Sequence, residues 1–582
     1  MQQGSQAIRR VRFVYALVAL VFGVFLVRSF YVQVIRHDFY RRAALADQLK
    51  EYQIPATRGL IEAHSGDGVV PIVLNQKLYT VYADPTLVKH ADQVAETLAA
   101  LLPGKSAADY QKLVQTAHTR YVVLAKKVDS GAKDQLLKHK YPGIGAQENT
   151  YRTYPNGALA SQLLGFVNND GTGVYGLEQA MNKTLAGTAG QLKAVTDING
   201  VPLAANTDNV EVPATPGSNV ILTIDMAMQK QLENILQDGL KNAKSNTGSA
   251  LIMDPNTGAI KAMANWPTYD PTNYADVSDP SVFNNAAVSS PLEVGSIMKV
   301  LTTAAALDQG VIKADQRYND PAHWTVDGFT ITNIEEDGGA GTKSIADLLN
   351  LSLNTGATWE LMQMSKPGGT DINQKGREAW YNYMANHYRL GKPTGIEQGY
   401  EAPGIIPDPN DGYARDLKYA NTTFGQGMTA TALQMGAALS AVLNGGTYYQ
   451  PHLVDQTIDA SGNTHTNQPK VVGRNVVSQQ TSNSIQSLME YVVANHFFRP
   501  GFDQSKFSVG GKTGTAQIAK PGGGYKDNDF NGTYMGFVGG DHPEYVIVVV
   551  AIEPKVGGYA GTAAAQPIFG SLAHMLIDNF GV

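Results

Sequence analysis

The chain has 582 residues, of which 43% are hydrophobic and 16% are charged, so it is long enough for two or three globular domains with large cores. The formal net charge of -6 is mild and unclustered, which argues against nucleic acid as the main partner. The chain contains no cysteine, which excludes disulfides, thiolate catalysis and cysteine-ligated metals.

The N-terminal segment predicts a membrane anchor. Residues 8–12 contain three arginines and no acidic residue, and residues 13–35 are predominantly apolar. As a helix, the apolar stretch would be roughly 34 Å long, enough to span a bilayer. The positive-inside rule makes residues 1–12 a cytoplasmic tail and places everything beyond the anchor outside the cytoplasm. A cleaved signal peptide is the alternative, but its cleavage motif, Ala44–Ala46, lies far beyond the apolar core, which favours a retained anchor.

Residues 36–216 have a mixed texture. A charged, Ala- and Leu-rich stretch over 36–55 predicts that the helix continues out of the membrane, and short apolar runs beyond it alternate with helical patterns over 91–102 and 107–117. A Pro- and Gly-bearing linker at 212–218 ends this part of the chain. The spacing of the 12 histidines fits no metal site, and we expect neither a metal nor a cofactor.

Residues 217–582 predict one α+β domain. Strand-like segments lie at both ends of this region: 219–224, 248–253, 259–263, 507–518, 533–538 and 545–552. Helix-like segments lie between them: a helix capped by Asp225, then 299–309, 345–363 and 431–443. This order predicts an antiparallel sheet that is formed from distant parts of the chain and flanked by helices.

Three short motifs carry the candidate chemistry: Ser296-Ile-Met-Lys299, Ser352-Leu-Asn354 and Lys512-Thr-Gly-Thr515. A serine hydroxyl is a poor nucleophile until a base removes its proton. The spacing of Ser296 and Lys299 places both on one face of a helix, and Gly295 before them suits a tight turn into that helix. Lys299 acts as a base only when it is neutral, which burial or a nearby positive charge such as Lys512 would favour.

The second and third motifs supply the remaining groups of the candidate site. Ser352 and Asn354 suit a turn, from which Ser352 would relay a proton between lysine and leaving group while Asn354 holds a substrate amide. Residues 507–518 predict an edge strand, in which Gly514 leaves room for a substrate backbone to pair.

The strand motif also predicts how a substrate is held. The hydroxyls of Thr513 and Thr515 could bind a terminal carboxylate, with Lys512 supplying positive charge. The backbone N–H groups of Ser296 and Thr515 form the predicted oxyanion hole. Each motif alone is weak, but the order S-x-x-K, S-x-N, K-T-G is that of penicillin-recognising serine acyl enzymes.

The chain resembles class B penicillin-binding proteins over nearly its whole length. Beyond the three motifs, the likeness includes Arg58–Ile61, Arg152–Pro155, Leu164–Gly165, Gly173–Glu178, Leu222–Asp225, Met263–Pro271, Phe424–Gly427, Thr431–Gln434 and Asn444–Gly446. It implies a transpeptidase domain over 217–582 on an elongated, mixed α/β pedestal of the dimerisation type over 36–216, with one transmembrane helix over 13–35. Tyr79–Pro85 and Met263–Pro271 look most like the septal, cell-division subtype, and the elongation subtype is the main competitor.

The resemblance implies a peptidoglycan D,D-transpeptidase in the cell membrane. Ser296 would attack the D-Ala-D-Ala bond of a stem peptide and form an acyl-enzyme, which an amine of a neighbouring stem would resolve. β-Lactams would trap the same serine. The implied partners are a polytopic glycosyltransferase of the shape–elongation–division–sporulation family and other division proteins. No glycosyltransferase domain precedes residue 216, which argues against the bifunctional class A type.

Two departures from the family pattern lie upstream of the nucleophile. Val294 stands where a proline is usual, and Asn284-Asn285-Ala286 lacks the usual arginine. Neither removes a catalytic group. Three other functions stay open: an elongation-type transpeptidase, a β-lactamase and a catalytically silent division scaffold. Turnover separates the last two from a transpeptidase, because a β-lactamase clears penicillin quickly and a scaffold does not react with it.

Overall fold

The computed structural model of the protein describes residues 3–40, 49–102, 104–195, 210–333, 339–495, 505–520 and 524–582. They fall into two compact units, one within residues 1–57 and 187–217, the other comprising 58–186 and 218–582. The alternative signal-peptide cleavage motif at 44–46 lies outside the described residues.

The first unit contains the apolar N-terminal helix. Helix α1 (Gln3–Phe30) continues into a short π-helix (Tyr31–Ile35). Arg9–Ile35 is long and apolar enough to cross a membrane: its most apolar window has a mean hydropathy of 2.2 and none of it is buried inside the protein. A helix that exposes apolar side chains all round suits the interior of a bilayer.

The same unit contains a three-stranded antiparallel sheet. Strand β8 (Gly190–Val195) lies between β1 (Leu49–Ile54) and β9 (Val210–Val212). The predicted helical continuation over 36–55 is therefore wrong at 49–54. There, backbone pairing with a segment far along the chain outweighs the local helical composition, which is only a weak prior.

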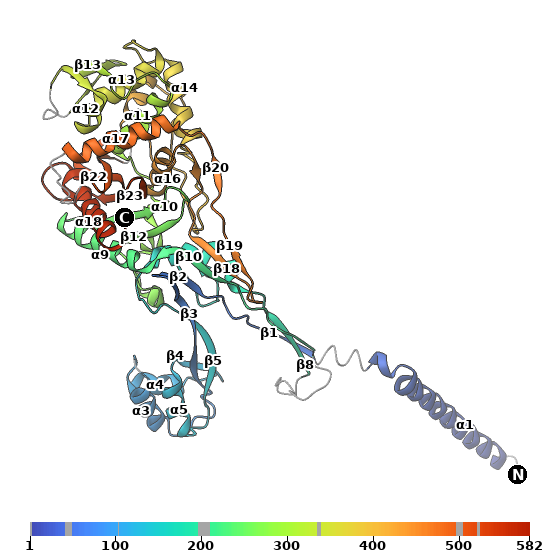
Figure 1. Ribbon diagram of the computed structural model, residues 1–582. Helices are drawn as coiled ribbons and strands as arrows, with labels where there is room; N and C mark the ends of the chain where they lie inside the picture. The colour runs from blue at the N-terminus through green and yellow to red at the C-terminus, as the bar shows by residue number, and fades with distance from the viewer. Residues whose placement is uncertain are drawn as a thin grey trace. The chain divides into compact units, whose positions relative to one another are not determined.

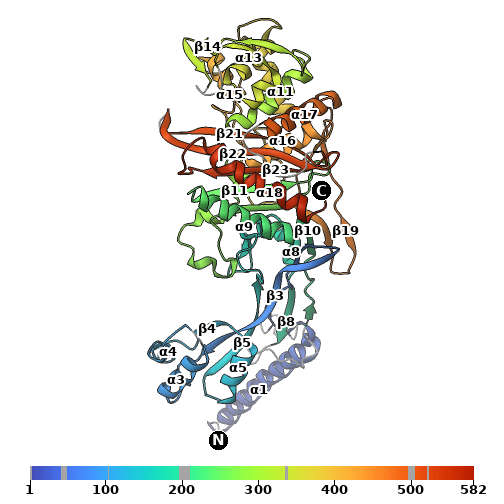
Figure 2. The same ribbon diagram turned by 60° about the vertical axis from the view of Figure 1, so that its left-hand side comes forward.

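The second unit begins with a sheet built around one long strand. Strand β3 (Gly68–Ala83) pairs with β2 (Ile61–Ser65), β4 (Val122–Val128) and β5 (Ile144–Thr153). Around its distal half, in the blue lobe of Figure 2, lie three helices: α3 (Ala91–Leu101), α4 (Ala107–Val114) and α5 (Ser130–Lys138). The predicted helices over 91–102 and 107–117 are confirmed. Ser106 and Asp109 form the capping box that starts α4.

The proximal end of this sheet joins the parts of the chain on either side of the linker. Strand β10 (Asn219–Asp225) pairs in parallel with β2 and antiparallel with β18 (Val454–Ile458), which pairs with β19 (Thr464–Thr466). Between β5 and β10 lie short elements: α6 (Ser161–Leu164), β6 (Phe166–Val167), β7 (Gly173–Val174), α7 (Gly176–Ala180) and α8 (Asn182–Ala186). The predicted boundary at residue 216 stays a prediction.

A five-stranded antiparallel sheet forms the centre of the larger part of this unit, which confirms the predicted α+β class. Its order is β12 (Ile260–Trp266), β11 (Thr247–Met253), β23 (Pro543–Ile552), β22 (Tyr525–Gly539) and β21 (Ser508–Ala519). Every neighbouring pair is antiparallel. The two ends of the domain thus meet in one sheet, with β21 at its edge.

Helices cover both faces of this sheet (Figures 1 and 2). Along β23, Val546, Val548 and Val550 join the core shared with α11 (Met298–Asp308), α16 (Ala432–Leu443) and α17 (Gln479–Asn495). The intervening residues, Ile547, Val549 and Ala551, pack with α9 (Met226–Asn242) and α18 (Gln566–Asn579). A strand that is buried on both faces consists of consecutive apolar residues, and residues 546–552 form such a run.

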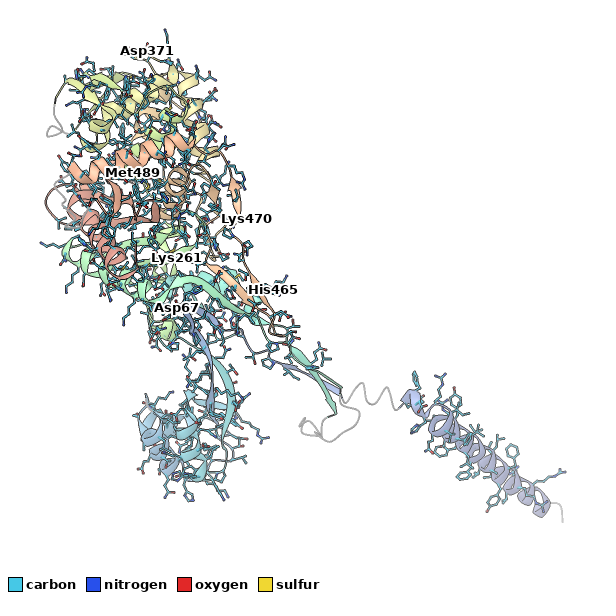
Figure 3. All side chains as sticks on the ribbon, in the orientation of Figure 1. Asp67, Lys261, Asp371, His465, Lys470 and Met489 are labelled. Atoms are coloured by element: carbon cyan, nitrogen blue, oxygen red, sulfur yellow. The ribbon has the colours of Figure 1, made fainter. Side chains whose placement is uncertain are left out.

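Local signals account for the positions of several helices. Asp225 caps α9 by accepting a hydrogen bond from the Met228 N–H at 2.8 Å, as predicted. Thr431 and Gln434 form the capping box of α16, whose residues are all buried. Met489, labelled in Figure 3, lies on α17 and is fully buried against β21 at Gly510.

A helical region beyond α11 completes the unit. It contains the helices α12 (Ile345–Asn350), α13 (Asn354–Ser365), α14 (Gln374–Asn382) and α15 (Arg415–Thr423). It also contains two antiparallel strand pairs: β13 (Arg317–Asp320) pairs with β16 (Gly341–Ser344), and β14 (His323–Val326) pairs with β15 (Phe329–Thr332). A further pair joins β17 (Tyr448–Tyr449) and β20 (Val471–Gly473). The predicted helix over 345–363 is interrupted at 351–353, where Ser352 has a φ of 57°.

Candidate active site

The first motif lies at the start of α11. A 3-10 turn, Gly295–Ile297, leads into the helix, and Gly295 has a φ of 64°, a conformation that glycine adopts without steric cost. A side chain at Gly295 would also meet the Thr515 carbonyl oxygen at 2.8 Å. The nucleophile turn therefore lies directly against β21.

The Lys299 amine connects the first and second motifs. Its side chain is fully buried, and Nζ lies 3.0 Å from Ser296 Oγ, 3.2 Å from Ser352 Oγ and 2.8 Å from Asn354 Oδ1. It also donates to the Ser352 carbonyl. The amine is thus within proton-transfer distance of two hydroxyl groups, one from each motif.

The second motif occupies the break between α12 and α13. Ser352 adopts a left-handed backbone conformation, which costs a non-glycine residue about 1 kcal/mol. This conformation turns both its carbonyl and its hydroxyl oxygen towards Lys299. Asn354 starts α13, and its amide is fixed because Nδ2 donates to the Thr332 carbonyl at 3.1 Å. The structure brings these two residues inwards, as the sequence predicted.

The third motif lies on β21 at the edge of the sheet. Lys512 and Gly514 are buried, whereas Thr513 and Thr515 are partly exposed, the alternation expected of a strand. Lys512 Nζ lies 3.0 Å from the Thr513 carbonyl oxygen. The predicted influence of Lys512 on the charge of Lys299 stays a prediction.

The sequence suggested that Gly514 leaves room for a substrate backbone, but the structure gives a different reason for a glycine at this position. A Cβ atom there would meet the Thr533 hydroxyl and, at 2.8 Å, the carbonyl oxygen of Val294. The space is thus filled by protein atoms and is not open to a substrate. The Thr533 hydroxyl donates to the same Val294 carbonyl at 2.8 Å, so β21 and β22 together support the turn that presents Ser296.

A cavity of about 150 Å³ opens above these groups. Five of the predicted site residues line it: Ser296, Ser352, Asn354, Thr513 and Thr515. Lys299, Lys512 and Gly514 are not among the described residues of its lining. The Thr515 hydroxyl accepts a hydrogen bond from the Gly561 N–H at 3.0 Å, which leaves its own proton to be donated.

Several other residues that line the cavity were not among those predicted from the sequence: Asn350, Leu351, Phe424, Gln426, Tyr559 and Thr562. Phe424 and Gln426 belong to a segment that carried the family resemblance, which was the available signal. No signal in the sequence pointed to Asn350, because it is a single amide side chain at the end of α12. Its Oδ1 atom is buried without a hydrogen-bond partner, so it can accept a hydrogen bond from a bound group.

The two departures from the family pattern do not enter the cavity. Val294 has a φ of -80°, within the range open to proline, so the valine keeps the backbone shape that proline would impose. Asn285 is buried, donates to Gln398 Oε1 at 3.0 Å and accepts from Asn265 Nδ2 at 2.9 Å. Asn285 therefore belongs to a neutral amide network with Asn265 and Gln398.

A buried carboxyl group lies behind Lys299. Glu360 on α13 is fully buried, and neither of its carboxylate oxygens has a hydrogen-bond partner among the described residues. Burial raises its pKa to about 8, against smaller opposing effects of the Thr303 hydroxyl and the Lys299 charge. Thr303 approaches without forming a hydrogen bond, since its hydroxyl is also unpartnered. At neutral pH Glu360 is therefore a neutral acid and adds no negative charge beside Lys299.

Two family profiles match the chain. The profile of the penicillin binding protein transpeptidase domain matches residues 248–574, and that of the penicillin-binding protein dimerisation domain matches residues 53–222. Together the two profiles cover most of both predicted regions, residues 36–216 and 217–582.

Individual proteins show the same likeness. The chain is 30% identical to stage V sporulation protein D of Bacillus subtilis over 581 residues, 99% of this chain and 86% of that one. It is 26% identical to peptidoglycan D,D-transpeptidase FtsI of Escherichia coli over 567 residues, 95% and 89% of the two chains. The crystal structure of penicillin binding protein 2X from Streptococcus thermophilus superposes with a TM-score of 0.72 at 25% identity, covering 91% of this chain and 80% of that one.

Replacing Glu360 with glutamine tests the state of the buried carboxyl. Folding raises its pKa from an unfolded value of about 4.3, so the stability that it contributes is present at low pH and is lost as the pH rises towards 8. Glutamine mimics the neutral acid at every pH. We therefore expect the free energy of unfolding of Glu360→Gln, relative to wild type, to increase between pH 5 and pH 8 by at most about 1.4 kcal/mol per pH unit. The measurement is thermal unfolding of the full chain in detergent.

The matched control is Glu378→Gln on the exposed face of α14, which should show no such pH-dependent gain. Parallel stability curves for wild type and Glu360→Gln would contradict a neutral Glu360.

Gly514→Ala tests the packing of β21 against the nucleophile turn. The added methyl group meets the Val294 backbone, which cannot move without displacing the turn, so we expect the free energy of unfolding to fall by about 1–3 kcal/mol. Gly557→Ala is the control, because nothing lies within 4 Å of the Cβ position there. Equal stability of the two variants, by thermal unfolding, would show that the strand and the turn are not in close contact.

Proposed function

The chain belongs to the class B penicillin-binding proteins, since the transpeptidase profile covers more than half of it, and from this we propose that it is a peptidoglycan D,D-transpeptidase with Ser296 as its nucleophile. The observation that carries the assignment of Ser296 is the position of the Lys299 amine. It lies within hydrogen-bond distance of Ser296 Oγ, Ser352 Oγ and Asn354 Oδ1.

Acylation follows from this geometry. Lys299, when neutral, accepts the proton of Ser296 as Oγ attacks the carbonyl carbon of the D-Ala-D-Ala bond. The negative charge that develops on the carbonyl oxygen is stabilised by the backbone N–H groups of Ser296 and Thr515. Ser352 shares the Lys299 amine and relays a proton to the nitrogen of the departing D-Ala. The products are an ester at Ser296 and free D-alanine.

The edge strand positions the stem peptide. In the described part of the chain β21 pairs with β22 alone, so its other edge can hydrogen-bond an extended peptide as an added strand. The hydroxyls of Thr513 and Thr515 lie at the cavity and bind the terminal carboxylate, with Lys512 providing positive charge from within the strand. Asn354 holds an amide of the peptide, and Asn350 offers a further acceptor.

An amine of a second stem peptide completes the reaction. It attacks the ester carbonyl, its proton passes to the Lys299–Ser352 pair, and Ser296 leaves as a hydroxyl group. A β-lactam enters by the same acylation step, but its ring-opened amine remains attached to the acyl group. The leaving group therefore cannot diffuse away, and the acyl-enzyme persists.

The chain is a single-pass membrane protein whose spanning segment lies within the apolar helix Arg9–Ile35. We infer that residues 1–12 are cytoplasmic and that the pedestal over 36–216 and the catalytic domain over 217–582 lie outside. A septal role is supported by likeness to FtsI and to stage V sporulation protein D. The proposed partners, met through the anchor and the pedestal, are a polytopic glycosyltransferase of the shape–elongation–division–sporulation family and other division proteins.

A fluorescent penicillin tests the acyl-enzyme directly. We expect the full-length protein in detergent to become covalently labelled and to keep the label through denaturing electrophoresis. Ser296→Ala should abolish labelling, whereas Ser571→Ala, an exposed serine on α18, should leave it unchanged. Equal labelling of Ser296→Ala would assign the nucleophile elsewhere. Folded wild type that remains unlabelled would favour a silent scaffold, and rapid release of hydrolysed penicillin would favour a β-lactamase.

A further inference from the structure

A second cavity, of about 380 Å³, lies where the pedestal sheet meets the segment after β12. Its walls come from β3, β4, β5, the turn after β6 and residues 271–274. It shares no lining residue with the catalytic cavity. Three basic side chains line it, Lys126, Lys127 and Arg152, and no carboxylate is among its described lining residues.

The positive charge at this cavity is not balanced by the groups behind it. Arg58 and Arg152 share a single carboxylate, that of Glu178, which is fully buried. Arg58 Nε and Arg152 Nε each donate to it at 2.7 Å. Two buried guanidinium groups and one carboxylate leave one net positive charge, and a buried charge without a counter-ion is strongly unfavourable.

Arg152, which lines the cavity, has hydrogen-bonding capacity that the described protein groups do not use. The Arg152 side chain is only 4% exposed, and its Nη1 donates to the Gly59 carbonyl and to Asn75 Oδ1. Its Nη2 is buried and has no hydrogen-bond partner among the described residues. A guanidinium nitrogen without a partner can bind an anion that reaches it.

Tyr154 supplies a second unused donor in the same wall. Its hydroxyl is buried without a hydrogen-bond partner, although the Val167 backbone lies near it. Burial raises the Tyr154 pKa well above its ordinary value, so the hydroxyl keeps its proton. Tyr154 and Arg152 can therefore each donate a hydrogen bond to a carboxylate, which in its ionised form only accepts.

The rest of the lining suits a polar, sugar-bearing chain. Lys127 Nζ donates to the Thr272 carbonyl at 2.9 Å and so ties the two sides of the cavity together. Lys126 is exposed at the rim. Amide side chains such as Gln147 and Asn149 can bond to hydroxyl and peptide groups, and the rings of Tyr121 and Tyr274 offer flat surfaces.

We propose that this cavity binds a carboxylate of a peptidoglycan glycopeptide, with Arg152 Nη2 and the Tyr154 hydroxyl as the anion-binding groups and Lys126 at its mouth. The choice of ligand rests on the proposed function, because the carboxylate is taken from the polymer on which the enzyme acts. The site would hold a second segment of that polymer beside the pedestal while Ser296 reacts with a stem peptide.

The probe is a soluble disaccharide–peptide released from peptidoglycan by a muramidase. Full-length protein in detergent is first acylated with penicillin, so that the catalytic cavity is blocked, and binding is then followed by titration calorimetry. We expect the fragment to bind the acylated protein. A fragment whose carboxylates have been converted to methylamides should bind at least about tenfold more weakly, because hydrogen bonds to a charged group are stronger than those to a neutral group. Inorganic phosphate is titrated in parallel.

Two variants locate the site. Tyr154→Phe removes a hydroxyl that has no partner in the protein, so it should leave the unfolding temperature unchanged or raised and weaken fragment binding about tenfold. Lys126→Glu reverses a charge at the rim and should weaken binding to a similar extent, without affecting penicillin labelling. Lys138→Glu, the same charge change on an exposed part of α5, should leave binding unchanged.

Three results would overturn the proposal: no binding to the acylated protein, equal binding by wild type, Tyr154→Phe and Lys126→Glu, or binding of phosphate in place of the fragment. The proposed function is judged separately by Ser296 labelling. A protein that is not labelled by penicillin, yet binds the fragment in a Tyr154-dependent way, would keep the second site and lose the assigned chemistry.

Discussion

The burial of the Lys299 amine among oxygen atoms from two separate motifs is the constraint on which the catalytic domain depends. An amine can be held at about 3 Å from two serine hydroxyls only if α11 and the break between α12 and α13 are fixed relative to each other. That accuracy needs a rigid surrounding core. Helix α16, buried along its whole length, and the two-faced strand β23 provide it. The strained backbone of Ser352 is tolerated because the same core fixes it in place.

The sheet contributes to the site at its edge. A central strand has both sides paired, whereas β21 has one side available in the described structure, and an exposed edge is a place where another extended chain can pair. The nucleophile turn covers one end of this edge, since Gly295 and Gly514 allow the backbones of the turn and the strand to approach within contact distance. In the proposed reaction, the free edge of β21 pairs with one extended peptide whose scissile bond lies beside Ser296.

Much of this could be predicted because the relevant signals are local. The apolar runs and turn residues of 248–263 and 533–552 predict hairpins, the capping residue Asp225 predicts the start of α9, and the three motifs predict which side chains form the site. What could not be predicted depends on contacts between distant segments. The strand at 49–54 forms because residues 190–195 pair with it. The requirement for Gly514 comes from Val294 and Thr533, and the neutrality of Glu360 comes from burial by several helices, so neither leaves a pattern in the neighbouring sequence.

The pedestal segments that carry the family resemblance can be understood in the same physical terms. Arg58, Arg152 and Glu178 come from three separate motifs and meet in one buried ion cluster, and Gly59 and Gly173 lie so close to other backbone that no side chain would fit. Replacing such a cluster with apolar side chains often costs no stability, so stability alone is a weak reason for a protein to keep it. A cluster with one more guanidinium than carboxylate, and with one unused donor on a residue that lines a cavity, has a physical reason to persist if an anion completes it. On this view the pedestal is a binding domain as well as a support, and its resemblance motifs mark the wall of its site.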